Sequence, residues 1–263
     1  MPFDSGDDPL ESSLPPRGAN LGPPEASLQP PALAHRAVAL LEVLLCSDYA
    51  TQAVLGATFA ALGYRPFGAS GQLSVGFVAT LSLMDTVLLV GLMLFFLYAH
   101  GERPGAVFLG SRSIAREASY GIPLILGALG IGIAVLATIQ HYAPSLHTVE
   151  HNPLQDLISR PRDAWLFAFV VVVAGGVREE LQRAFLLHRF EQWLGGATVG
   201  LVVASLAFGA GHLLQGVDAA VATGLLGAFW GLVYLRRRSV VAPMVSHSGF
   251  DLLQIVQVFV VGR

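Results

Sequence analysis

Five side chains able to move protons or stabilise an oxyanion lie within long apolar stretches of the sequence: Glu179, Glu180, His212, His247 and Asp251. A charged group inside a membrane span costs about 2.5–3.5 kcal/mol on insertion scales, so such groups are functional candidates by default. A carboxylate partly withdrawn from water can act as a general base, and histidines can assist it. The residue types therefore indicate acid–base hydrolysis. Phosphate-loop and Schiff-base chemistry are excluded because the chain contains no lysine.

Two of these groups stand four residues from a second charged residue, which places both members of each pair on one helical face. Glu179 precedes Arg183, with the acidic residue on the favourable N-terminal side, and His247 precedes Asp251. Each pair has a structural interpretation as well as a catalytic one. The Glu179–Arg183 pair in particular is also what a packing ion pair between helices would look like.

Two motifs in this region resemble those of the CPBP intramembrane endopeptidases, the family that includes the CAAX-prenyl proteases. That family carries EExxxR, FxxxH and HxxxN on three successive core helices, with Asp sometimes replacing the Asn. Here the second motif is Phe208-Gly-Ala-Gly-His212, and the third is His247-Ser-Gly-Phe-Asp251 with the Asp variant. The resemblance covers about residues 164–261.

The first motif departs from the family pattern, because residues 178–183 read Arg-Glu-Glu-Leu-Gln-Arg. If the two glutamates are matched to the family, Arg183 falls one position early. If Arg183 and the residues after it are matched, Glu179 takes the second glutamate position and Arg178 replaces the first. Glu179 is a motif glutamate in either register, and both registers remain open.

The resemblance implies a role for each polar residue. Glu179 would activate a water molecule with help from His212, and Glu180 is the alternative base. His247 would stabilise the oxyanion of the reaction intermediate. For Asp251 the family role is chemically difficult, because an ionised carboxylate only accepts hydrogen bonds and would repel an oxyanion. We therefore expect Asp251 to orient His247.

Arg183 and Phe208 complete the predicted site as supporting residues. The predicted reaction is hydrolysis of a peptide bond in a membrane-associated or lipid-modified peptide, at or within the lipid bilayer. We expect no cofactor and no nucleic-acid partner. Two alternatives remain: a zinc-dependent membrane metalloprotease, because Glu, His and Asp are all zinc ligands, and a catalytically inactive membrane scaffold of the same fold.

The composition requires that these residues be positioned by membrane helices. Hydrophobic residues make up 54% of the chain and charged residues only 13%, about half the charge of a typical soluble domain. The one cysteine, Cys46, excludes an intramolecular disulfide and any multi-cysteine metal site. The sequence therefore predicts an integral membrane protein.

A bilayer core about 30 Å thick needs roughly 20 apolar residues in a helix. Six stretches of the sequence clearly meet this length. A seventh candidate, residues 37–62, is interrupted by Glu42 and Asp48 and is either an interfacial helix or a further span. Asp85 lies within a span and is expected to pair with a polar group on a neighbouring helix. The fold class is an all-α polytopic bundle of six to seven transmembrane helices plus a possible interfacial helix. The six clear stretches are 73–99, 118–139, 164–193, 194–215, 217–235 and 240–261.

The chain divides into a tail and a membrane-embedded helical domain. Residues 1–33 hold eight of the fifteen prolines and no apolar period, so we expect a disordered, acidic tail. Residues 34–263 form the membrane domain, with the family-like catalytic core at about 164–261.

Arginines concentrate at alternate ends of the predicted spans, so threading the six spans places all of these arginines on one side. The positive-inside rule makes that side cytoplasmic, in a cytoplasmic membrane of bacterial type. The arginines concerned are Arg103, Arg112, Arg116, Arg189 and Arg236–Arg238.

Overall fold

The computed structural model of the chain describes residues 33–68, 73–150, 157 and 161–261. The predicted disordered tail lies outside these ranges, apart from Leu33, which begins the first helix. Within the described ranges the regular structure is helical, as predicted for an all-α fold, and the strand-type pairing is confined to one isolated bridge between Phe67 and Leu73.

Helices make up most of the described residues. In chain order they are α1 (Leu33–Leu45), α2 (Asp48–Ala61), α3 (Val75–Ala99), α4 (Pro104–Phe108), α5 (Ile114–Tyr142), η1 (Pro144–Leu146), α6 (Pro161–Val170), η3 (Val171–Arg178), α7 (Glu179–Trp193), α8 (Ala197–Ala210), η4 (Leu213–Gln215), α9 (Val217–Arg237) and α10 (Val241–Val261).

Each of the six predicted spans contains a helix. By length and composition, three of the described helices are able to cross a membrane by themselves: α3, α5 and α9. The stretch 164–193 is one rod made of α6, η3 and α7. The stretch 194–215 differs from prediction, because α8 ends after 14 residues at Ala210 and a short turn of 3-10 helix follows. The total of six to seven crossing helices stays a prediction.

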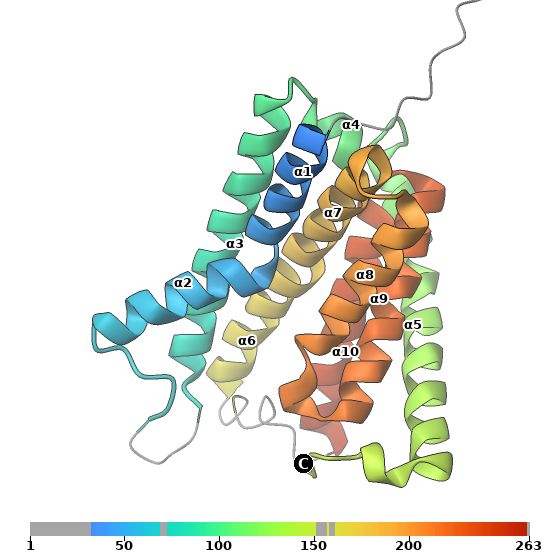
Figure 1. Cartoon of the computed structure of the whole chain (residues 1–263). Coiled ribbons are helices and arrows are strands. Elements are labelled where there is room, and N and C mark those ends of the chain that lie inside the picture. The colour runs from blue at the N-terminus through green and yellow to red at the C-terminus, as the bar shows by residue number, and fades with distance from the viewer. Residues whose placement is uncertain (1–32, 69–72, 151–156, 158–160, 262–263) are drawn as a thin grey trace, which may run out of the picture. The chain divides into compact units, whose positions relative to one another are not determined.

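The seventh candidate, 37–62, is neither one straight helix nor a single surface helix. It consists of α1 and α2, which bend by 50° at a short break after Leu45 and together are apolar enough for a broken span or a re-entrant pair. Figure 1 shows α2 turning away from the direction of α1. The break brings Asp48, the first residue of α2, to the corner between the two helices.

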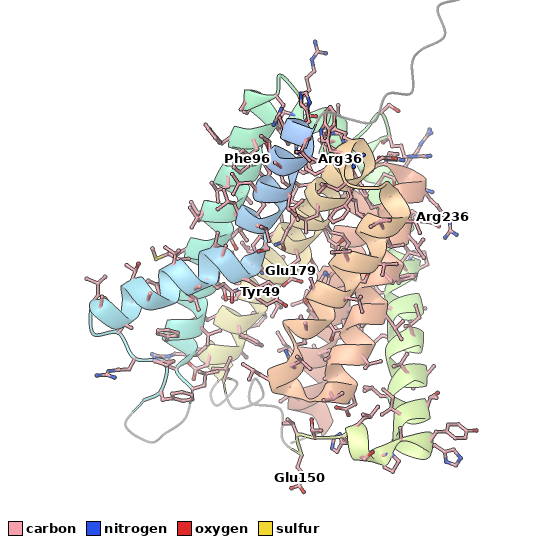
Figure 2. The ribbon with its side chains drawn as sticks, in the orientation of Figure 1. Arg36, Tyr49, Phe96, Glu150, Glu179 and Arg236 are labelled. Carbon is pink, nitrogen blue, oxygen red and sulfur yellow. The ribbon has the colours of Figure 1, made fainter. Side chains whose placement is uncertain are left out.

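From α3 to α10, long helices that follow one another in the chain run in opposite directions, with α6, η3 and α7 counted as one helix (Figure 1). Arg36 and Arg236 therefore lie at one end of the bundle and Glu150 at the other (Figure 2). At the end that carries Arg36 and Arg236, further arginines form hydrogen bonds and ion pairs with groups on neighbouring elements. We call it the arginine end and define it by Arg36, Arg112, Arg189, Arg236, Arg237 and Arg238.

Apolar side chains serve two purposes in this bundle. Some large apolar side chains lie on outward-facing surfaces, such as Val87 of α3, which is 76% exposed, and Leu126 of α5, which is 71% exposed. Water would penalise such a surface, whereas lipid chains accept it, so the outer faces fit a bilayer. Inside, α3 and α7 share one buried cluster formed by Leu89, Met93, Leu97, Ala184, Phe185 and Leu187.

Small residues allow close helix packing, as the sequence predicts for the uncharged stretch 118–139. In α5, a Cβ added at Gly127 or Gly132 would lie in ordinary contact with Phe229 or Phe250. On α8, a Cβ at Gly209 would lie 2.6 Å from the carbonyl oxygen of Ala220. The backbones of α8 and α9 therefore touch at that point, which brings the end of α8 toward the bundle interior.

Candidate active site

The glutamate pair lies in the middle of one long helix that changes type along its length. α6 passes into η3, an eight-residue π-helical segment, and η3 passes into α7, whose first residues are Glu179 and Glu180. π-Helical turns are rare and occur frequently at functional sites. The two glutamates therefore follow directly on an unusual stretch of backbone.

Two glycines in η3 bring α10 close to this helix. A Cβ on Gly176 would overlap Oγ of Ser248, and a Cβ on Gly175 would lie 2.7 Å from Oδ2 of Asp251. The overlap at Gly176 involves a side chain held near its own backbone, so relief requires the two helices to separate. This close approach lets side chains of α7 and α10 meet within hydrogen-bond distance.

Glu180 is enclosed and holds two of the predicted site residues. Its Oε1 accepts a 2.8 Å hydrogen bond from Nδ1 of His247 and is paired with Nη1 of Arg183. The predicted pairing of Arg183 with Glu179 is wrong, because the carboxylate of Glu179 is occupied by Arg178. Since an ionised carboxylate can only accept, the Nδ1 atom of His247 carries the proton and Nε2 faces the rest of the site.

Glu179 is the more accessible member of the pair. Its side chain is 14% exposed, against 1% for Glu180. Oε1 of Glu179 accepts a 3.1 Å hydrogen bond from Nη2 of Arg178. Oε2 lies 3.8 Å from Nε2 of His247, and Oδ2 of Asp251 lies 3.7 Å from the same nitrogen. These separations exceed direct hydrogen-bond length, so the three polar atoms face one another without being closed off.

The ring of His247 is fixed by contacts that the sequence did not indicate. We expected Asp251 to orient it, but the hydrogen bond to the ring comes from Glu180. The indole of Trp230 stacks on the imidazole at 3.8 Å between ring centroids and 17° between planes. Trp230 is held in turn by a 3.1 Å hydrogen bond from its Nε1 to Oγ of Ser246.

His212 reaches the cluster through Phe208. Nδ1 of His212 lies 2.9 Å from the carbonyl oxygen of Phe208, which leaves Nε2 available. The Phe208 ring lies 5.0 Å from the His212 ring and 6.1 Å from the His247 ring, between centroids. The guanidinium of Arg183 lies 4.7 Å from the centre of the same phenyl ring. The structure thus gathers all seven predicted residues in one neighbourhood, with His212 at its edge.

Arg178 and Asp48 are neighbours of the site that sequence reasoning missed as such. Arg178 is 5% exposed and is ion-paired with Asp48, Asp85 and Glu179. The expected pairing of Asp85 with a polar group on a neighbouring helix is confirmed by Arg178, 3.4 Å away. Asp48 lies 130 residues from Arg178 in sequence. The sequence signal for Asp48 was that it is the second charged residue, after Glu42, to interrupt the apolar stretch 37–62.

Two concavities in the structure lie away from this cluster. One of about 220 Å³ is lined by α1 with His100 and Trp193, and one of about 490 Å³ lies between α2 and α3. Neither is lined by Glu179, His212 or His247. In the described part of the chain, no group of three or more His, Cys, Asp or Glu side chains is arranged to hold a metal ion.

A protein-family model described as type II CAAX prenyl endopeptidase Rce1-like matches residues 161–253. These residues form an Rce1-like domain. The match confirms the family resemblance that the three motifs indicate. No curated protein and no solved structure matches the chain.

The Rce1-like domain runs from the start of α6 into α10 and contains every residue predicted for the site. It does not contain Asp48 of α2 or Asp85 of α3, two of the three carboxylates that pair with Arg178. The neighbourhood of Glu179 is therefore built from the Rce1-like domain together with two helices that precede it.

Proposed function

We propose that this chain is an intramembrane endopeptidase in which Glu179 activates water for attack on a peptide bond. The observation that carries the proposal is the meeting of Oε2 of Glu179, Oδ2 of Asp251 and Nε2 of His247, at 3.7–3.8 Å, inside an Rce1-like domain. The family is described as an endopeptidase family, and this arrangement offers a base and a proton donor at one place.

In the first step, Oε2 of Glu179 accepts a proton from a water molecule as the water oxygen attacks the scissile carbonyl carbon. Glu179 fits this role better than Glu180, since both Arg183 and His247 already engage one oxygen of Glu180. A general base must reach the proton that it removes, and the more exposed carboxylate meets that requirement.

The oxyanion that forms needs a hydrogen-bond donor held in place beforehand. Nε2 of His247 is that donor when the ring is protonated. Glu180 holds the ring by Nδ1 and Trp230 by stacking, so the direction of Nε2 is fixed. Oδ2 of Asp251 lies 3.7 Å from that nitrogen and places a further carboxylate beside it, whereas the orientation of the ring comes from Glu180 and Trp230.

In the second step, the protonated Glu179 returns its proton to the nitrogen of the leaving amine as the carbon–nitrogen bond breaks. His212 assists at the edge of the site, where its free Nε2 can exchange protons with substrate or water. Each step balances with water as the sole co-reactant and requires no cofactor.

The proposed substrate is a membrane-associated or lipid-modified peptide, since the site lies within helices whose outer faces suit lipid. Figure 2 shows Glu179 between the arginine end and the end marked by Glu150. We place the arginine end on the cytoplasmic side of a cytoplasmic membrane of bacterial type, following the positive-inside rule.

The test is cleavage of prenylated and unprenylated peptides by the purified chain in lipid vesicles. Glu179→Gln should lower kcat by about 10²–10⁴-fold, the range for loss of a general base. Glu191→Gln is the matched control, because Glu191 is on the same helix and pairs with Arg238 at the surface. Equal activity of wild type and Glu179→Gln would move the base to Glu180 or elsewhere.

The same assay decides the two alternatives. Activity that disappears with a chelator and returns with zinc would support a metalloprotease. No cleavage by wild type or either variant, with all three folded, would support an inactive scaffold of the same fold.

A further inference from the structure

We propose that Arg178 is a positioning residue for Glu179, and that Asp48 of α2 and Asp85 of α3 hold Arg178 in place. This inference rests on the proposed role of Glu179 as the base. It assigns a function to α2 and α3, which lie outside the Rce1-like domain.

All three nitrogens of the Arg178 guanidinium are engaged. Nη2 donates to Oε1 of Glu179 at 3.1 Å, and Nε donates to the carbonyl oxygen of Ala174 at 3.2 Å. Nη1 contacts Oδ2 of Asp85 at 3.4 Å and is also bonded to Oδ1 of Asp48. A planar guanidinium held from three directions cannot rotate or move away, so its contact with Glu179 is fixed.

The contact determines which oxygen of Glu179 takes part in chemistry. Oε1 is bound by Arg178, so Oε2 is the oxygen that faces His247. If the guanidinium were absent, the carboxylate would be free to turn about its terminal bond. A nearby cation also favours the ionised form that a general base needs.

Burial explains why Arg178 needs its other partners. Its side chain is 5% exposed, and a buried charge is costly unless it is paired. Asp85, at 1% exposed, is a permanent internal partner, whereas Asp48 is 28% exposed at the corner of α2. Of the two carboxylates that hold Arg178, the more accessible one is therefore Asp48, which α2 supplies.

A second contact fixes the same turn of α2. The hydroxyl of Tyr49 donates a 2.7 Å hydrogen bond to the carbonyl oxygen of Ala207 near the end of α8. Figure 2 shows Tyr49 and Glu179 at a similar level of the bundle. The first turn of α2 is thus tied to α8 through Tyr49 and to Arg178 through Asp48.

A purely structural role for Arg178 would change the amount of folded protein and leave the chemistry of the folded fraction unchanged. A positioning role affects kcat. We expect Asp48→Asn and Arg178→Gln to lower kcat by up to about 10²-fold, the cost of misplacing a reacting group by about 1 Å, with KM unchanged. Asp48→Glu and Arg178→Lys should recover part of the loss. Asp218→Asn is the control, because Asp218 also lies in the first turn of a helix and pairs with His147.

A second measurement does not depend on activity. A hydrophobic carbodiimide labels carboxylic acids that are neutral, and mass spectrometry locates the label. Labelling of Glu179 in Arg178→Gln should be about 10-fold faster than in wild type, because a cation that favours ionisation is lost. Labelling in Asp218→Asn should equal wild type.

Unchanged kcat in both folded variants, together with unchanged labelling in Arg178→Gln, would overturn the positioning role while leaving the proposed function intact. Faster labelling of Arg178→Gln in a chain that cleaves no peptide would have the opposite meaning. The positioning of Glu179 by Arg178 would then be supported, and the endopeptidase proposal would fail. Arg178→Lys keeps the test available should Arg178→Gln not fold.

Discussion

Two groups of buried charges in this bundle use the same residue types in different ways. At the arginine end, Arg189 is 1% exposed and bonded to Glu42 at 2.5 Å and to Glu102 at 2.7 Å. Nearby, Arg237 holds Glu117 through two hydrogen bonds of 2.6 and 2.7 Å. Both oxygens of each of these carboxylates are hydrogen-bonded, so the carboxylates are closed. In the described part of the chain, Nη2 of Arg189 is buried without a hydrogen-bond partner.

The cluster around Glu179 is closed on one side only. Arg178 and Arg183 saturate Oε1 of Glu179 and of Glu180, whereas Oε2 of Glu179 lies 3.8 Å from the nearest nitrogen of His247. Closed pairs fix helices relative to one another, and polar atoms left open at a fixed place are available to a substrate. We therefore expect the pairs at the arginine end to contribute to stability and the cluster around Glu179 to contribute to chemistry. Variants in each group can test this difference.

The largest expected effect on stability is at Arg189. Arg189→Met leaves Glu42 buried without its cation, and breaking a buried pair in this way costs about 3–5 kcal/mol. The measurement is the free energy of unfolding in detergent, together with kcat of the fraction that folds, which should match wild type. Arg238→Met is the control, because its partner Glu191 is exposed and such pairs contribute about 0–1 kcal/mol. A loss no greater than that of the control would contradict the comparison.

An intermediate effect is expected at Gly176, where stability and chemistry meet. Gly176→Ala forces α10 away from η3, because its Cβ overlaps Ser248, and overpacking of this kind costs about 1–3 kcal/mol. A displacement of about 1 Å at a catalytic group can lower the rate 10²-fold, so kcat should fall more than stability implies.

Gly130→Ala provides the matched control for that variant, since a Cβ at Gly130 of α5 meets nothing within 4 Å. It should leave cleavage as in wild type and raise the free energy of unfolding by about 0.4–1 kcal/mol, because alanine is favoured over glycine inside a helix. Normal cleavage by Gly176→Ala would show that the close approach of η3 and α10 is not needed for the reaction.

The smallest expected effect concerns Glu102, in the turn between α3 and α4. Burial raises the pKa of Glu102, but hydrogen bonds from Gln192 and Arg189 outweigh it, so its pKa lies below the ordinary value. A depressed carboxyl pKa contributes stability above the unfolded value of about 4.3, and this is lost as pH falls through the folded value.

Glu102→Gln should therefore lower the unfolding midpoint at pH 7 by an amount equivalent to less than about 1 kcal/mol. The gap from wild type should narrow at about pH 3, below the unfolded pKa. Glu150→Gln, at the opposite end of the bundle (Figure 2), should show no such convergence. A gap that widens in acid would show that the paired carboxylate does not stabilise this turn.

Hydropathy and spacing predict much of this arrangement because they are local. The apolar stretches correctly located α3, α5, α9 and α10. The spacing of His247 and Asp251 correctly placed them on one face of α10, where they lie 3.7 Å apart. The local sequence pattern did not predict which of the two adjacent glutamates Arg183 pairs with, because that depends on residues far away in the sequence. Arg183 pairs with Glu180 because Arg178, held from α2 and α3, has already taken Glu179.

Other features of the site are outside the reach of a single sequence. The stacking of Trp230 on His247 requires knowing how α9 faces α10. The hydrogen bond from His247 to Glu180 requires the close approach of η3 and α10, which depends on Gly175 and Gly176. Glycines in an apolar stretch indicate that something comes close, but they do not identify it.

The short helix α8 has a consequence for the membrane around it. Fourteen residues span about 21 Å, whereas the hydrocarbon core is about 30 Å thick. Its outer face is apolar, with Leu206 70% exposed, so lipid would have to adapt to it if α8 spans the bilayer as predicted. Hydrophobic mismatch of this sign is relieved by local thinning of the bilayer. Headgroups and their water would then be drawn toward the end of α8 where His212 lies, bringing the co-reactant of hydrolysis to a depth that an undisturbed bilayer would keep dry.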